Sequence, residues 1–156
     1  MIRAGCLVAA LAIAGCARPA DPVAAPVPLR NPTAPVASQA DVTAARLQGD
    51  WIVVQGAGIA PGTVVRGTAD GLTVQGVEYI LTAPGRLSNA DGRLWVHWLD
   101  IGDRTAAVGD PDGGRVWIMD REAGSSPDRL RAAREILDWY GYDLRRLAGL
   151  GRGMGS

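Results

Sequence analysis

From about residue 41 to residue 150 the chain consists of short apolar runs separated by residues typical of tight turns. Asp-Gly dipeptides, a preferred sequence of two-residue hairpin turns, occur at Asp70-Gly71, Asp91-Gly92 and Asp112-Gly113. The runs predicted as strands are residues 51–54, 63–65, 72–81, 94–99, 105–108 and 116–119. Because the connections are short, we expect a mainly β domain whose consecutive strands pair in antiparallel, up-and-down order.

One predicted strand changes its hydrophobic phase along its length. Between Leu72 and Leu81 the apolar positions are even-numbered up to Val74 and odd-numbered from Val77. The change falls at Gly76, which predicts a β-bulge there. Because bulges bend strands, this pattern favours a sheet that closes into a barrel.

The end of the body has the pattern of a single helix. Ser126 is a suitable N-cap, Pro127 suits the first turn, and Gly141 is a typical stop. Apolar residues recur at three- and four-residue spacing along one stripe, at Leu130, Ala133, Leu137 and Tyr140. The arginines of this segment lie mostly off the stripe. The helix is therefore expected to pack on the outside of the sheet.

The first residues have the composition of an export signal. A basic start at Arg3 precedes an apolar stretch too short to span a bilayer, and small residues lead up to Cys16. This ending is similar to the lipobox of bacterial lipoproteins, which predicts a signal peptide over residues 1–15 and lipidation of Cys16. Ala17 follows the cysteine where the inner-membrane retention signal has an aspartate, so the resemblance favours the outer membrane, facing the periplasm.

The remaining composition narrows the function further. Cys6 lies in the predicted leader, so the mature chain keeps Cys16 alone and cannot form a disulfide within itself. The 16 basic and 16 acidic residues balance, which gives no electrostatic support for a nucleic-acid partner. Prolines are dense between residues 17 and 40, as in a semi-rigid tether. The expected organisation is therefore residues 1–15 signal peptide, 16–40 lipidated cysteine and tether, 41–150 folded domain, and 151–156 disordered tail.

Four stretches of the body resemble motifs of the lipocalin family. Residues 49–51 (Gly-Asp-Trp) are similar to the G-x-W start of the first strand, and residues 103–111 to the D-Y-R-x-A-x-V-G-x-P stretch of bacterial lipocalins. Residues 117–121 resemble the W-I-L-x-R strand, and residues 141–147 the closing G-Y-D-x-x-x-L tail. The likeness is weak between residues 57 and 87. Asp103 stands directly before Arg104, where the family usually has Tyr.

The resemblance implies a lipocalin-like (calycin) barrel with the C-terminal helix outside. In that family the first tryptophan closes one end of the barrel under the arginine of the last strand, which implies that Trp51, next to Gly49, lies beneath Arg121. The region between Trp51 and Leu94 is shorter than in typical members, so we expect a reduced barrel with a small cavity.

No residue pattern indicates an enzyme. His97 is the only histidine, no G-x-S-x-G elbow is present, and neither a metal nor an organic cofactor is expected. The Gly-rich segment after Gln55 leads to Pro61 and a β-branched run rather than to a helix, so it does not match a dinucleotide fingerprint. Strand alternation suggests a set of ligand-lining residues: Val53, Gln55, Tyr79, Leu81, Trp95 and His97. For His97 the alternation leaves open whether the side chain faces inward or outward.

Two functions fit these observations. The resemblance favours a membrane-anchored carrier of a small hydrophobic or amphipathic ligand, a fatty acid or lysophospholipid, that binds by burial of apolar surface without a covalent step. The alternative is an envelope structural or interaction module whose barrel is filled by its own side chains and takes no small ligand. The short middle region favours this alternative.

Overall fold

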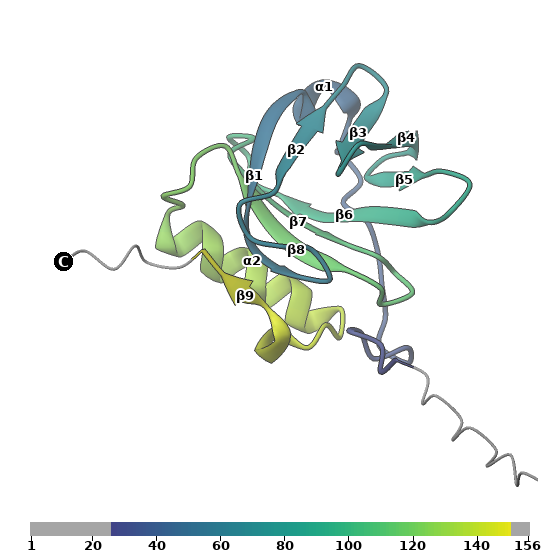
Figure 1. The fold of residues 1–156 in the computed structure, drawn as a ribbon, viewed down its shortest axis with the longest axis vertical. Coiled ribbons are helices and arrows are strands. Elements are labelled where there is room, and N and C mark those ends of the chain that lie inside the picture. Colours follow the sequence, from purple (N-terminus) through teal and green to yellow (C-terminus); the bar gives the residue numbers. More distant parts are fainter. Residues whose placement is uncertain (1–25, 151–156) are drawn as a thin grey trace, which may run out of the picture.

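Consecutive strands pair along the chain until the sheet closes on itself (Figure 1). The computed structural model describes residues 26–150, so the predictions for the signal peptide, Cys16 and the C-terminal tail lie outside the described residues. The barrel strands are β1 (Gly49–Ala57), β2 (Val64–Gly67), β3 (Gly71–Val74), β4 (Val77–Ala83), β5 (Arg86–Ser88), β6 (Arg93–Leu99), β7 (Thr105–Gly109) and β8 (Val116–Asp120). Strand β1 pairs with both β2 and β8, which closes an eight-stranded antiparallel barrel and confirms the predicted fold class.

Strand β1 divides its hydrogen bonds between two neighbours. Its residues 49–52 pair with β2, and its residues 52–57 pair with β8. The register with β8 shifts between Val53 and Gln55, so Val54 lies in a bulge. A ninth short strand, β9 (Ala148–Gly149), pairs with Gln55 and Gly56 at the end of β1 that β2 does not reach.

The segment predicted as one strand with a bulge at Gly76 forms two strands. Strand β3 ends at Val74 and β4 begins at Val77, and both residues between them have positive φ, 51° at Gln75 and 80° at Gly76. Positive φ at both central positions defines a type I′ hairpin turn. The phase change at Gly76 therefore marks a turn, and the bulge prediction is wrong. The turn was missed because it has Gln where Asn or Asp is usual.

Buried side chains form two layers, one on each face of the barrel wall. The inner layer fills the barrel and includes Trp51, Trp117 and Met119. The outer layer lies between the wall and α2 (Pro127–Trp139) and includes Ile118 and Leu137. Alternate residues of β8 thus face opposite sides, as a strand buried on both faces requires.

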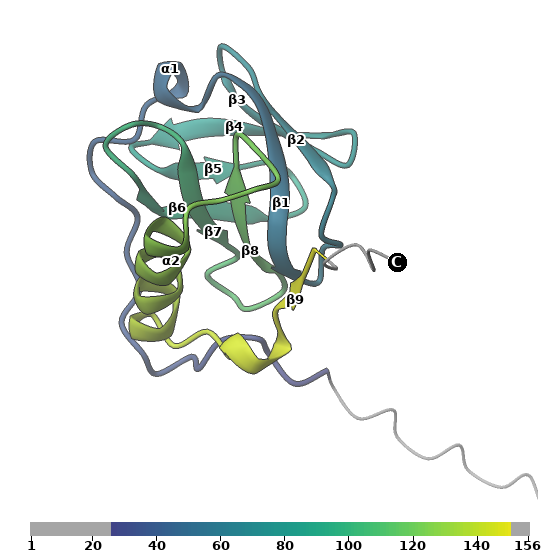
Figure 2. The same ribbon diagram turned by 90° about the vertical axis from the view of Figure 1, so that its left-hand side faces the viewer.

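Helix α2 packs outside the barrel as predicted (Figure 2). Ala133 and Leu137 are buried, and Leu130 and Tyr140 pack at the edge of the same layer. Ser126 occupies the N-cap position, but its side chain makes no capping hydrogen bond. The start of the helix is instead set by Pro127, whose missing N–H needs no partner there. Among residues 26–150, no helix combines the length and the apolar composition needed to cross a bilayer.

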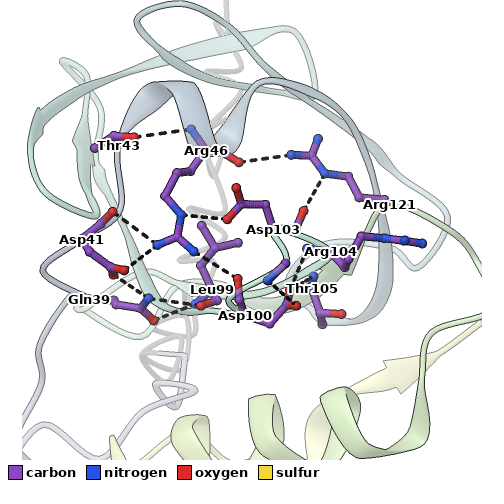
Figure 3. A network of polar contacts seen from close by, with 11 residues as sticks. Gln39, Asp41, Thr43, Arg46, Leu99, Asp100, Asp103, Arg104, Thr105 and Arg121 are labelled. Atoms are coloured by element: carbon purple, nitrogen blue, oxygen red, sulfur yellow. Dashed lines mark hydrogen bonds and ion pairs between the residues drawn. The ribbon is translucent and has the colours of Figure 1, made fainter.

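One end of the barrel is closed by the short helix α1 (Ala44–Leu47) and by a polar network (Figure 3). The indole N–H of Trp51 donates to the carbonyl of Leu47 over 2.7 Å, and the guanidinium of Arg121 lies 3.5 Å from the centre of the Trp51 ring. Arg46 forms ion pairs of 2.7 Å with both Asp41 and Asp103. The predicted stacking of Arg121 on Trp51 is therefore confirmed.

Residues 26–43, part of which was expected to be tether, lie along the barrel and the C-terminal segment. Leu29 is buried, and its N–H donates to the carbonyl of Gly113. The buried guanidinium of Arg30 donates to the carbonyls of Pro111 and Pro35. These buried contacts distinguish residues 26–40 from a free spacer. They went unpredicted because a proline-rich composition is equally compatible with an extended segment that docks onto a surface.

Candidate functional site

The end of the barrel opposite α1 is formed by four connections, which we call the mouth. They are the β1–β2 loop (residues 58–63), the β3–β4 turn (75–76), the β5–β6 loop (89–92) and the β7–β8 loop (110–115). Figure 2 shows α1 and β9 at opposite ends of the barrel, with β9 at the mouth end. Any small molecule that reaches the interior without passing the closed end must enter here.

The inner wall of the barrel is apolar. Its largest fully buried side chains are Trp51, Trp117, Leu72, Leu87, Leu94 and Met119. Buried polar side chains of the described residues lie on the outside instead: Thr105 and Asp120 contact Arg129 of α2, and His97 contacts Tyr142. The interior is thus an apolar, side-chain-filled space.

The structure places three of the predicted lining residues on the inner face. Val53 and Tyr79 are buried in the inner layer, and Leu81 packs against it while remaining partly exposed. That these three residues contact a ligand remains a prediction.

The other three predicted lining residues face outward, so their assignment to the barrel interior is wrong. Gln55 accepts a hydrogen bond of 2.6 Å from Arg134 of α2. The ring of Trp95 lies under the guanidinium of Arg86, with 4.5 Å between the ring centre and Cζ. His97 is buried outside the barrel wall.

Two bulges explain these errors. The register shift between Val53 and Gln55 turns Gln55 outward, although strict alternation would keep it on the face of Val53. A second shift between Val96 and Trp98 breaks the alternation in β6, so Trp95 and His97 do not share the inner face of Leu99. Trp98 therefore joins the outer layer, on the same side of the wall as Trp95, although a regular strand would place the two on opposite sides.

His97 lies between the N-terminal segment and the residues that follow α2. Its Nδ1–H donates to the carbonyl of Ala37 over 2.6 Å, its Nε2 lies 2.9 Å from the hydroxyl of Tyr142, and the Tyr140 ring centre is 5.1 Å away. The pKa of His97 is about 4, because burial and, to a smaller extent, the positive charge of Arg30 lower it, while the hydrogen bond to Ala37 opposes them. Burial also raises the pKa of the Tyr142 hydroxyl. The histidine is therefore neutral at physiological pH and joins two chain segments.

Polar side chains reach the apolar interior at the mouth. Arg115, at the end of the β7–β8 loop, donates a hydrogen bond of 2.7 Å from Nη2 to the hydroxyl oxygen of Tyr79 on β4. Its Cζ lies 5.6 Å from the centre of the Tyr79 ring and 6.0 Å from that of Trp117. The pair thus joins strands on different sides of the mouth.

The sequence analysis did not single out Arg115 or Trp117 as site residues. A signal was present, because Arg115, Trp117 and Met119 alternate and so share one face of the last strand. Elsewhere, no group of His, Cys, Asp and Glu side chains among residues 26–150 is arranged to hold a metal ion.

A closed up-and-down barrel that starts at a G-x-W sequence, stacks an arginine on that tryptophan and carries one helix outside has the lipocalin fold. Solved lipocalin structures have a similar fold. Lipocalin 12 from rat epididymis, determined by solution NMR, superposes with a TM-score of 0.51 at 12% identity, covering 76% of this chain and 90% of that chain. The bovine lipocalin allergen Bos d 2 gives a TM-score of 0.50 at 12% identity, covering 69% and 94%. No protein-family model matches the sequence, and no curated protein does.

Proposed function

We propose that this chain is a non-enzymatic binding protein that holds a small amphipathic molecule, such as a fatty acid or a lysophospholipid, in the mouth of its barrel. An acylated Cys16 holds it at the outer membrane, facing the periplasm. The observation that carries the proposal is the contrast between an apolar inner wall and a polar group, Arg115 with Tyr79, at the open end. Such a gradient matches a molecule with an apolar tail and a polar head.

Burial of the tail supplies the driving force. Each Å² of apolar surface removed from water contributes about 25 cal/mol, so burial of most of one acyl chain is needed to offset the cost of association and reach micromolar affinity. The interior is already occupied by large side chains, which favours a ligand with a single slender chain over a bulky one.

A titration tests the binding. The full chain carrying Cys16→Ala, which removes any acyl group of its own, is titrated with cis-parinaric acid, a fluorescent fatty acid, while energy transfer from tryptophan is recorded. Saturable transfer at micromolar probe is expected, because Trp51 and Trp117 lie inside the barrel. No saturable signal would contradict the proposal.

Two substitutions on β3 locate the bound probe. Val74→Trp fills the inner face near the mouth and is expected to abolish saturable transfer, because Val74 is buried in the inner layer. Thr73→Trp places the same side chain on the other face of the strand and is expected to leave binding intact. Unchanged binding in a folded Val74→Trp variant would place the probe outside the barrel.

The anchor is tested separately by mass spectrometry of the chain purified from membranes. An N-terminal acylated Cys16 is expected, and Cys16→Ala is expected to move the protein from the membrane fraction to the soluble fraction. Recovery of wild-type chain with an unmodified cysteine would contradict the anchor and leave the ligand proposal unaffected.

The packed interior also favours the second candidate, an interaction module of the cell envelope that binds no small molecule. The two candidates differ in the titration above. A barrel that is permanently filled gives no saturable transfer with any single-chain amphiphile.

A further inference from the structure

We infer that the head of the ligand is anionic, and that Arg115, Tyr79 and Trp117 hold it at the mouth. This inference rests on the proposed function and assigns a site and a charge to its ligand. It starts from hydrogen-bond donors that the described residues leave without acceptors.

Arg115 is partly exposed and has fewer acceptors around it than Arg121 at the closed end. Its Nη2 donates to the hydroxyl oxygen of Tyr79, and no carboxylate of residues 26–150 lies within ion-pairing distance of its guanidinium. Arg121, at the closed end, donates to the carbonyls of Gln48, Arg46 and Asp103. The two ends of the barrel therefore differ. Arg121 at the closed end donates to three carbonyls, whereas Arg115 at the mouth has one acceptor among the described residues.

The two aromatic neighbours of Arg115 add further donors. The Tyr79 hydroxyl accepts from Arg115, so its own proton remains available, and Tyr79 is only 5% exposed. The indole Nε1 of Trp117 is buried and has no acceptor among the described residues, although the side chain is fully enclosed. A buried donor without an acceptor is rare in folded proteins and calls for a missing partner.

The three residues lie close together at the mouth of the barrel. Arg115 directly precedes β8 and Trp117 lies on the inner face of that strand, two positions further on, while Tyr79 reaches them from β4. A carboxylate or phosphate supplies two or three acceptor oxygens and a negative charge, which matches several donors grouped around one guanidinium. A neutral head, such as a hydroxyl, offers one acceptor and no charge.

The test compares ligands that differ only in the head. The full chain with Cys16→Ala is titrated with a fatty acid, the fatty alcohol of the same chain length, and a lysophosphatidic acid of that length, each displacing cis-parinaric acid. Wild type is expected to bind the two anionic ligands at least tenfold more tightly than the alcohol. The two anions distinguish a carboxylate head from a phosphate head.

Substitutions assign the preference to the three residues. Arg115→Gln is expected to weaken binding of the acids at least tenfold and to leave the alcohol unchanged, whereas Arg115→Lys retains the preference. Tyr79→Phe and Trp117→Phe, which remove one donor each and keep a ring, are expected to weaken acid binding severalfold. The matched control is Arg93→Gln, which removes an exposed charge near the mouth that pairs with Asp112, and is expected to change neither affinity.

The outcomes separate this inference from the proposed function. If wild type binds acid and alcohol equally, or if Arg115→Gln weakens both alike, the anionic-head assignment is wrong while binding in the barrel stands. If no ligand binds, the proposed function itself fails. Thermal melting of each variant shows whether it is folded, and Tyr79→Phe and Trp117→Phe keep the test decisive if Arg115→Gln does not fold.

Discussion

The guanidinium of Arg121 lies 3.5 Å from the centre of the Trp51 ring and donates from Nε to the carbonyl of Asp103. Its other nitrogens donate to the carbonyls of Gln48 and Arg46, so one side chain joins the start of β1, the helix α1 and the β6–β7 loop. A planar cation with donors pointing in several directions is needed for this, because an ammonium group can neither stack as well nor reach all three acceptors.

Replacing Arg121 by lysine is therefore expected to destabilise the fold by about 2 kcal/mol, because the stacking on Trp51 is lost and carbonyl acceptors are left without donors. Urea unfolding followed by tryptophan emission measures the change. The control is Arg131→Lys on α2, whose exposed ion pair with Asp128 contributes little. Equal stability of the two variants would mean that the closed end does not depend on the guanidinium.

Acidification is expected to destabilise the protein through His97. The pKa of His97 is about 4 in the folded chain, below its usual value of 6.5. Above pH 6.5 the imidazole is neutral in both states, so the contribution is fully present. As the pH falls from 6.5 to 4 the unfolded chain takes up a proton that the folded chain does not, which removes about 3 kcal/mol in total.

The measurement is urea unfolding at several pH values in wild type and in His97→Gln. The variant lacks the titrating group, so the difference in unfolding free energy between the two proteins is expected to change across this pH window and to be constant above it. A constant difference from pH 8 to pH 4 would show that the imidazole is not desolvated in the folded chain.

Gly67 is expected to tolerate no side chain. A Cβ at this position of β2 would lie 1.7 Å from the carbonyl oxygen of Leu47, a backbone atom of α1 that cannot move alone. Gly67→Ala should cost about 3 kcal/mol, at the upper end of overpacking effects. Gly92→Ala, in the β5–β6 loop, meets no atom within 4 Å and is expected to be close to neutral in the same thermal melt. Similar melting temperatures for both variants would contradict the close approach of α1 to β2.

The N-terminal segment is expected to stabilise the barrel through Arg30. Its guanidinium is buried and donates to the carbonyls of Pro111 and Pro35. Arg30→Met keeps most of the apolar stem and removes the donors, and is expected to lower the unfolding free energy by about 2 kcal/mol. Arg146→Met, which removes an exposed hydrogen bond to the carbonyl of Val27, is the control. If neither variant loses stability, the segment contributes no stabilisation through this residue.

Sequence patterns predicted the barrel because its determinants are local. Alternation and Asp-Gly turns each depend on a few neighbouring residues, whereas the contact of Trp51 with Arg121 was implied by the lipocalin resemblance. The direction of individual side chains depends on bulges. The extra residue at Val54 turns Gln55 outward, and the one at His97 puts Trp95 and His97 out of phase with the inward Leu99. No residue at these positions signals a bulge, since Val and His both fit a regular strand.

The mouth was harder to predict for a different reason. The pair of Arg115 and Tyr79 joins residues 36 positions apart, and no pattern in one strand indicates which side chain will meet it across the barrel. The small number of acceptors around Arg115 depends on the folded structure, because it is set by residues that are distant in the sequence.

If Cys16 carries a lipid, as proposed above, the docking of residues 26–43 limits the distance between that lipid and the barrel. Only residues 17–25 separate that cysteine from the described body, and nine extended residues reach about 30 Å at most. The chain joins the barrel at the end where Leu29 bonds Gly113 of the β7–β8 loop. With a linker of this length, an acylated protein would keep its open end within about one bilayer thickness of the lipid headgroups. Single-chain amphiphiles that leave the membrane would enter the solvent in that region.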